Sequence, residues 1–151
     1  MAQFVYLLHH AQALSGEIDH TRPLSTVGLQ QAELVARGAA QHGAKPGVIW
    51  HSGKLRARQT AEAWVRLVNP FAIFAAVRGL RPDDDPDMAA TALVTEDRDV
   101  VLASHMPLLP ALLHRLITGQ HDRQSASFPL NGCVALERAG ELWQARWTIA
   151  P

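Results

Sequence analysis

Short apolar runs alternate along the chain with longer segments in which apolar residues recur at helical spacing. The short runs predict four buried strands, at residues 3–8, 48–51, 71–77 and 99–104. The longer segments predict four helices, which begin near Thr26, Leu55, Asp87 and Pro107 and end before Gly43, Pro70, Thr95 and Gly119. Strands that alternate with helices predict a mainly parallel sheet with helices on both faces.

The C-terminal part of the chain departs from this alternation. Residues 121–129 predict an irregular loop between elements. Residues 133–136 and 142–149 predict two strands of a hairpin around Ala139-Gly140. We therefore expect an α/β fold, a three-layer α/β/α sandwich with a mainly parallel sheet and antiparallel C-terminal edge strands. The length of 151 residues, with no repeat or linker-like stretch, indicates a single domain over residues 1–151.

Composition excludes several classes of function. The 14 acidic and 14 basic side chains cancel, which argues against a nucleic-acid partner and against a polybasic membrane anchor. The one cysteine, Cys133, excludes an intramolecular disulfide and the usual multi-cysteine zinc sites. Residues 1–10 have neither the basic start of a signal peptide nor an apolar run that could span a membrane. We expect a cytoplasmic protein that binds neither nucleic acid nor membrane.

Arginine and histidine are more frequent than the neutral charge suggests. All basic residues except Lys45 and Lys54 are arginine, and 8 residues are histidine. Arginine forms a planar fork that suits phosphate and carboxylate, and histidine titrates near neutrality. The base composition of the genome could by itself produce the arginine excess. The positions of these residues must therefore show whether the excess has a functional meaning.

These residues follow the predicted strands. His9 and His10 follow the first strand, residues 51–56 follow the second, and residues 104–107 follow the last parallel strand. Because the carboxyl ends of parallel strands meet at one edge of a sheet, where ligands bind in open α/β folds, we expect these groups to lie together. Arg56 would lie near a helix start, where free N–H groups favour an anion. The sequence therefore predicts a phosphate pocket.

Four segments resemble the motifs of a known family. They are Tyr6-Leu-Leu-His-His10-Ala-Gln-Ala13, Asp19-His-Thr-Arg22-Pro-Leu-Ser-Thr-Val-Gly28, Ser52-Gly-Lys-Leu-Arg56-Ala-Arg-Gln-Thr-Ala61 and Val101-Leu-Ala-Ser-His105-Met-Pro107. In order and spacing, over residues 3 to about 110, they resemble the histidine phosphatase superfamily, which has the phosphoglycerate mutase-like fold. Within it they resemble the short SixA-like phosphohistidine phosphatases.

The resemblance implies a role for each matched residue. His10 would attack phosphorus to give a covalent phosphohistidine that water then hydrolyses. Arg56 would hold the phosphoryl oxygens, and His105 would bind the same group and stabilise charge in the transition state. Arg22, in the Arg-Pro-Leu segment of the short members, would add a phosphate contact. No metal or other cofactor is expected, because arginine and histidine supply the cationic stabilisation that phosphoryl transfer needs.

One position departs from the family pattern. His9 stands where the family has an arginine, and a histidine lacks the fork that holds two phosphate oxygens. We keep His9 as a phosphate-binding residue and hypothesise that bound phosphate favours its protonated form, which would make activity best at mildly acidic pH. His51 is a candidate compensating donor.

The general acid is less evident than the phosphate-binding groups. Asp19, in the loop after the first strand, is the candidate proton donor, and the run Asp83-Asp-Asp85 is the alternative. Larger relatives use a glutamate after the third strand, and this chain has none there. An imidazole leaving group needs little protonation, so this absence favours a substrate with an N–P bond.

Together these features predict a phosphatase that acts on phosphohistidine in a protein partner and releases inorganic phosphate. Hydrolysis of a small phosphorylated substrate is an alternative. A module that binds phosphate or a phosphoprotein without turnover is another, because His9 replaces the family arginine. A metal site at His9, His10, His51 and His105 is disfavoured, because adjacent residues of a strand point to opposite faces.

Overall fold

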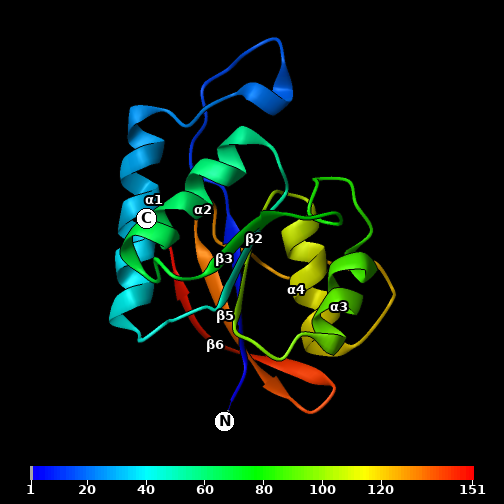
Figure 1. The fold of residues 1–151 in the computed structure, drawn as a ribbon. Coiled ribbons are helices and arrows are strands. Elements are labelled where there is room, and N and C mark those ends of the chain that lie inside the picture. Colours follow the sequence, from blue (N-terminus) through cyan, green and yellow to red (C-terminus); the bar gives the residue numbers. More distant parts are fainter. Residues whose placement is uncertain (1) are drawn as a thin grey trace.

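The computed structural model describes residues 2–151 and contains one mixed sheet of six strands between two pairs of helices (Figure 1). The strands are β1 (Phe4–His9), β2 (Val48–His51), β3 (Ile73–Ala76), β4 (Val100–Ser104), β5 (Cys133–Ala139) and β6 (Leu142–Ile149). The helices are α1 (Thr26–Gln41), α2 (Leu55–Leu67), α3 (Pro86–Thr95) and α4 (Leu108–Thr118), with a 3₁₀ turn η1 (Asp19–Thr21).

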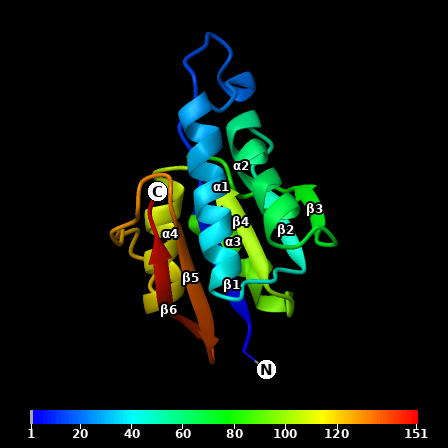
Figure 2. The ribbon, with the colours of Figure 1, turned by 90° about the vertical axis from the view of Figure 1, so that its left-hand side faces the viewer.

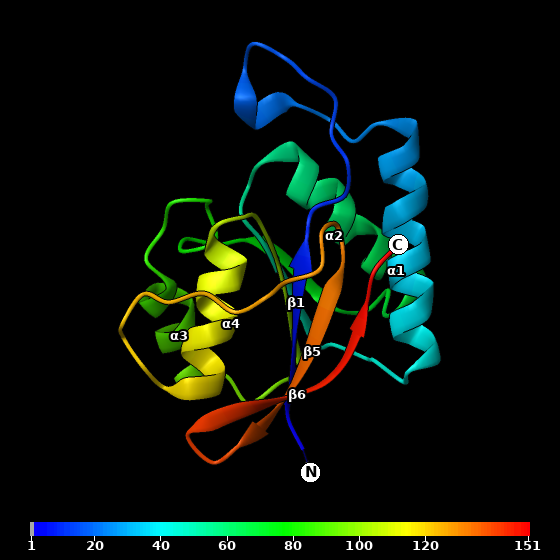
Figure 3. The ribbon, with the colours of Figure 1, turned by 180° about the vertical axis from the view of Figure 1, so that it is seen from behind.

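The strand order confirms the predicted sheet. It is β3-β2-β4-β1-β5-β6, and β1, β2, β3 and β4 run parallel to one another. β5 pairs antiparallel with β1, and β6 pairs antiparallel with β5 at the edge. The C-terminal hairpin therefore extends a parallel sheet with antiparallel strands, and Figure 3 shows it on the far side of β1 from β2.

Alternation along the strands assigns their side chains to the two faces of the sheet. Tyr6 and Leu8 of β1 belong to the core under α1 and α2, in which Trp64 is fully buried. Val5 and Leu7 belong to the core under α3 and α4. Figure 2 shows α1 and α2 in front of the sheet, with α4 and α3 behind it. The three-layer α/β/α prediction is confirmed.

Most predicted elements occur close to their predicted bounds. α1 begins where Ser25 accepts the N–H of Gly28 at 3.0 Å, which caps the helix. The third strand is shorter than predicted because the N–H of Phe71 donates to Oδ1 of Asn69, so a turn replaces the start of the strand. The 3₁₀ turn η1 was not predicted.

The carboxyl ends of the parallel strands all lie at one edge of the sheet, the upper edge in Figure 1. The segment between β1 and α1 extends beyond this edge, whereas the chain enters β1 from the opposite one. None of the helices within residues 2–151 is both long and apolar enough to cross a bilayer.

Candidate active site

Three imidazole rings lie together at this edge of the sheet. His9 ends β1 and is in register with Ser104, which ends β4, so the residues that follow them are neighbours. The ring of His10 lies 4.4 Å from that of His9 and 5.0 Å from that of His105, measured between centroids. The structure therefore brings together all three histidines that were predicted to lie in the site.

The expectation that His9 and His10 point to opposite faces is wrong. β1 ends at His9, and the backbone N–H of His10 turns to donate to the carbonyl of Ser104 at 3.1 Å. The alternation of a strand no longer applies beyond its last residue, so the two rings can lie together.

A hydrogen bond at Nδ1 of His10 leaves its other ring nitrogen, Nε2, without a hydrogen. Its Nδ1 lies 2.7 Å from the carbonyl oxygen of Ala11, which can only accept, so Nδ1 carries the hydrogen. Burial lowers the pKa of His10 to about 4; the hydrogen bond to Ala11 opposes this shift and the charge of Arg56 adds to it. At neutral pH the ring is therefore uncharged with its lone pair on Nε2, the form in which imidazole is a nucleophile.

His9 is held in the opposite tautomer by a loop far away in sequence. The backbone N–H of Asn131 donates to His9 Nδ1 at 2.8 Å, so the hydrogen of the neutral ring is on Nε2. Burial, with smaller contributions from His10 and Arg56, lowers the pKa of His9 to about 3. His9 is therefore neutral in this arrangement: a second ring proton would break the bond from Asn131 and place a buried charge beside Arg56. The hypothesis that bound phosphate favours the protonated form stays a prediction.

His105 is almost completely buried and bonded to a serine. Its Nε2 lies 2.6 Å from Oγ of Ser52, and its Nδ1 has no hydrogen-bond partner within residues 2–151. Burial lowers the pKa of His105 to about 2, and the charges of His10 and Arg56 add to the shift. The ring is neutral, and whichever tautomer it adopts leaves a buried polar atom unsatisfied at Nδ1.

Arg56 and Asp19 form the charged part of the site. The Arg56 side chain is 6% exposed; its Nη1 donates to the backbone carbonyl of Asp19 at 3.0 Å and lies 3.4 Å from Oδ1 of the carboxylate. Lys54 also contacts this carboxylate, and Nε of Arg22 lies 3.6 Å from it. Arg22 is close enough to His10 for its charge to lower the pKa of that ring. Both predicted arginines therefore lie beside the histidines.

The charges around Asp19 bear on its predicted role as proton donor. The hydrogen bond from Lys54 is the largest cause of an Asp19 pKa lowered to about 2, and Arg56 adds to it. An ionised carboxylate has no proton to donate, so this arrangement makes Asp19 a counter-ion of the cations. In the alternative acidic run, Asp84 and Asp85 accept backbone N–H groups of Arg81 and Asp87 and so stabilise local structure.

The segment after His10 is tied to α2 by one threonine. Oγ1 of Thr60 accepts the N–H of Ala11 at 3.0 Å and donates to the carbonyl of Arg56 at 2.7 Å. Since Thr60 is buried, these bonds fix the distance between the chain that carries His10 and the helix that carries Arg56.

His51 does not join the group. Its Nδ1 accepts the N–H of Gly53 at 3.1 Å, and its ring lies 4.9 Å from that of Phe74. Burial lowers its pKa, and the cation that adds to the shift is Arg58. Within residues 2–151, no three or more His, Cys, Asp or Glu side chains are grouped as a metal ion would require.

Three residues to which sequence reasoning gave no role contact the histidines or their partners: Ser52, Lys54 and Asn131. Ser52 and Lys54 lie inside a quoted motif, so their positions carried a signal. The position of Asn131 carried no such signal, because it lies in the loop before β5, 121 residues from His10. Its side-chain amide donates to the carbonyl of His10 at 2.9 Å.

Comparison with known proteins gives a match in structure. No protein-family model matches the sequence, and no curated protein matches it. A structure of the protein histidine phosphatase SixA complexed with tungstate has a TM-score of 0.86 and 24% identity, and the match covers 98% of this chain and 97% of that one. A SixA structure from Agrobacterium tumefaciens, whose description as a phosphohistidine phosphatase is provisional, has a TM-score of 0.83 and 27% identity over 100% and 99% of the two chains.

A third structure widens the comparison. It is a mycobacterial glucosyl-3-phosphoglycerate phosphatase in complex with VO3, with a TM-score of 0.74 and 17% identity over 99% of this chain and 100% of that one. The chain therefore has the fold of the histidine phosphatase superfamily. Among these structures it is most similar to the SixA phosphohistidine phosphatases, as the sequence motifs predicted. This similarity supports a phosphatase function.

Proposed function

We propose that this chain is a phosphatase that transfers a phosphoryl group first to Nε2 of His10 and then to water. The observation that carries the proposal is a set of buried nitrogens without partners around a neutral imidazole. Nε of Arg22, Nε of Arg56 and Nδ1 of His105 make no hydrogen bond within residues 2–151. Buried polar atoms normally have partners, and a phosphoryl group would bring acceptor oxygens to all three.

The proposed reaction has two steps. In the first, the Nε2 lone pair of His10 attacks phosphorus; an N–P bond forms while the bond from phosphorus to the leaving group breaks. Arg56 and Arg22 stabilise the negative charge on the equatorial oxygens, and His105 and His9 add hydrogen bonds. In the second step water attacks phosphorus and the bond to His10 breaks. The proton of the water passes to the phosphate, and neutral His10 is restored. These steps use no metal ion.

Phosphohistidine in a protein is the substrate that this site suits best. A phosphohistidine ring protonated on its other nitrogen leaves as a neutral imidazole, so its departure needs no strong acid. Asp19 is paired with Lys54 and Arg56 in its ionised form, which fits a reaction without a general acid. The structural similarity to SixA, described as a protein histidine phosphatase, supports the same choice.

The test compares turnover of a phosphohistidine-containing protein with turnover of an aryl phosphate. We expect the wild-type protein to hydrolyse phosphohistidine with the larger kcat/KM. We expect His10→Ala to reduce kcat by roughly 10³-fold or more, because it removes the nucleophile. His42→Ala is the matched control, since His42 stacks on Trp147, outside the site, and should leave kcat unchanged. Turnover of the aryl phosphate alone would instead favour a small phosphorylated substrate.

A second candidate is a module that binds phosphate without turning it over. It is favoured by His9, whose neutral ring offers one N–H where an arginine would offer a charged fork. Tungstate binding to a wild-type protein that hydrolyses neither substrate would support this candidate and overturn the enzymatic proposal.

A further inference from the structure

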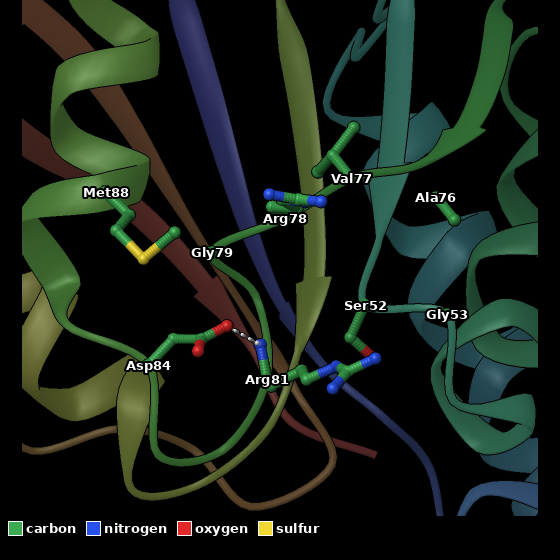
Figure 4. Close-up of a pocket in the computed structure, with 9 residues that line it drawn as sticks. All are labelled: Ser52, Gly53, Ala76, Val77, Arg78, Gly79, Arg81, Asp84 and Met88. Atoms are coloured by element: carbon green, nitrogen blue, oxygen red, sulfur yellow. Dashed lines mark hydrogen bonds between the residues drawn. The ribbon is translucent and has the colours of Figure 1, made fainter.

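A cavity of about 550 Å³ lies beside the candidate active site, between the ends of β2 and β3 and the start of α3 (Figure 4). Ser52 lies in its wall, and the hydroxyl of the same residue bonds to His105. Ser52 therefore connects the cavity to the three histidines. A leaving group on this side of the site would lie next to the cavity.

The charged groups in the wall of the cavity are mainly positive. They are Arg78, Arg81 and Asp84. The Asp84 carboxylate is already engaged, because its Oδ2 accepts the backbone N–H of Arg81 at 2.9 Å. Figure 4 shows the Arg81 side chain extending away from Asp84 and toward Ser52.

The guanidinium groups of these two arginines are free to bind an anion. Both side chains are exposed, and neither forms an ion pair with another of residues 2–151. A single exposed arginine is common on protein surfaces. Two that line one cavity next to the candidate active site provide two planar guanidinium groups in one place, and such groups suit carboxylates.

We propose that this cavity binds acidic side chains that flank the phosphohistidine of a protein substrate. The inference rests on the proposed function and adds a preference for the sequence around the phosphorylated residue. A peptide segment fits better than a small molecule, because Arg78 and Arg81 are exposed at the surface and can reach groups outside the cavity. Met88, also in the wall, supplies a flexible apolar contact for the stems of such side chains.

The test uses two phosphohistidine peptides that are identical except that Asp and Glu residues near the phosphohistidine in one are Asn and Gln in the other. We expect wild-type kcat/KM to be about 3- to 10-fold higher for the acidic peptide, since each exposed ion pair contributes only a small factor. This preference should act through KM and shrink as salt is raised.

The double variant Arg78→Gln/Arg81→Gln should lower the preference to less than about twofold while leaving turnover of an aryl phosphate unchanged. Arg37→Gln is the matched control, because Arg37 is exposed on α1, away from the cavity, and its loss should leave the preference intact. Equal kcat/KM for the two peptides in the wild-type protein would overturn the subsite and leave the proposed function standing.

A binding measurement keeps the subsite testable without turnover. Adding the acidic peptide in unphosphorylated form should shift the amide NMR signals of Gly53 and Gly79, which line the cavity, in the wild-type protein but not in the double variant. Absence of hydrolysis would contradict the proposed function but not the subsite. Absence of these shifts, or equal shifts with the neutral peptide, would overturn the subsite.

Discussion

Hydrogen bonds to the backbone decide where the hydrogens of His9 and His10 lie. The carbonyl of Ala11 holds the hydrogen of His10 on Nδ1, and the N–H of Asn131 holds that of His9 on Nε2. Two adjacent residues of the same type thus have opposite tautomers. His10 can offer a lone pair to phosphorus, and His9 can offer an N–H to a phosphoryl oxygen.

This assignment predicts distinct NMR signatures for the two rings. In protein labelled with ¹⁵N in its histidines, His10 should show a protonated Nδ1 and His9 a protonated Nε2. Both rings should stay neutral from pH 8 to about 5, because burial lowers their pKa values to about 4 and about 3. Titration of either ring near its ordinary pKa of about 6.5 would contradict the assignment.

The Asp19 carboxylate neutralises cations that the proposed reaction needs. It contacts Arg56, Lys54 and Arg22, and these contacts leave less positive charge available to a phosphoryl group. We expect Asp19→Asn to tighten tungstate binding by about two- to fivefold, the size of an exposed ion-pair effect. Calorimetric titration would measure the change. Glu17→Gln, in the same loop but without such contacts, is the control, and weaker binding to Asp19→Asn would show that the carboxylate organises the site instead.

Sequence reasoning predicted which candidate residues lie together but not their protonation states. Strand ends and motif order predicted that His9, His10, His105 and Arg56 would lie together. The neutral state and the tautomer of His9 were not predicted, because burial and the bond from Asn131 depend on a loop that folds back from the other end of the chain. No local pattern in the sequence encodes such a contact.

Among the elements, α1 packs directly against the chain next to the site. Its first turn presses against the segment that follows His10: a Cβ added to Gly28 would lie 2.0 Å from the carbonyl oxygen of Gln12. Only glycine permits this approach of two backbones. The contact is one reason why the segment between β1 and α1 keeps a defined course above the sheet edge.

We therefore expect Gly28→Ala to lower the free energy of unfolding by about 1–3 kcal/mol, as overpacking generally does, and to reduce tungstate affinity by displacing the chain next to His10. Urea denaturation and calorimetric titration would measure the two effects. In the control Gly47→Ala, the added Cβ would lie 3.6 Å from its nearest neighbour, an ordinary contact. An unchanged Gly28→Ala protein would show that the close approach is not required.

The regular elements were predictable because their patterns are local. The bounds of β2 matched, and α1 ended within two residues of its prediction, because apolar spacing and the cap at Ser25 depend on neighbouring residues. Two turns were not predicted. A side-chain to backbone hydrogen bond stabilises the turn at Asn69, and apolar periodicity does not reveal such a bond. The 3₁₀ turn η1 has no apolar pattern that marks it.

At the scale of the whole molecule, the three central histidines make stability depend on pH. His9, His10 and His105 have pKa values lowered to about 3, 4 and 2 in the folded protein, whereas the unfolded chain binds protons near the ordinary value of about 6.5. Between these values the unfolded state binds more protons, so the free energy of unfolding must fall as the pH drops below about 6.5.

The free energy of unfolding should fall by up to about 1.4 kcal/mol per pH unit for each histidine that is protonated in the unfolded chain and neutral in the folded protein. Urea denaturation between pH 7 and pH 4.5 would measure the slope. His9→Gln should reduce it, whereas replacing the exposed His20 in the same way should not. A free energy of unfolding that stays constant over this range would contradict neutral histidines in the folded protein.

The central claim is that Nε2 of His10 carries the phosphoryl group between substrate and water. Its most direct test is to mix the protein with a ³²P-labelled phosphohistidine substrate, stop the reaction within milliseconds in alkaline denaturant, which preserves N–P bonds, and map the label. We predict label on His10, absent in His10→Ala and present in the His42→Ala control. Rapid release of labelled phosphate with no label on His10, or label retained in His10→Ala, would contradict the account.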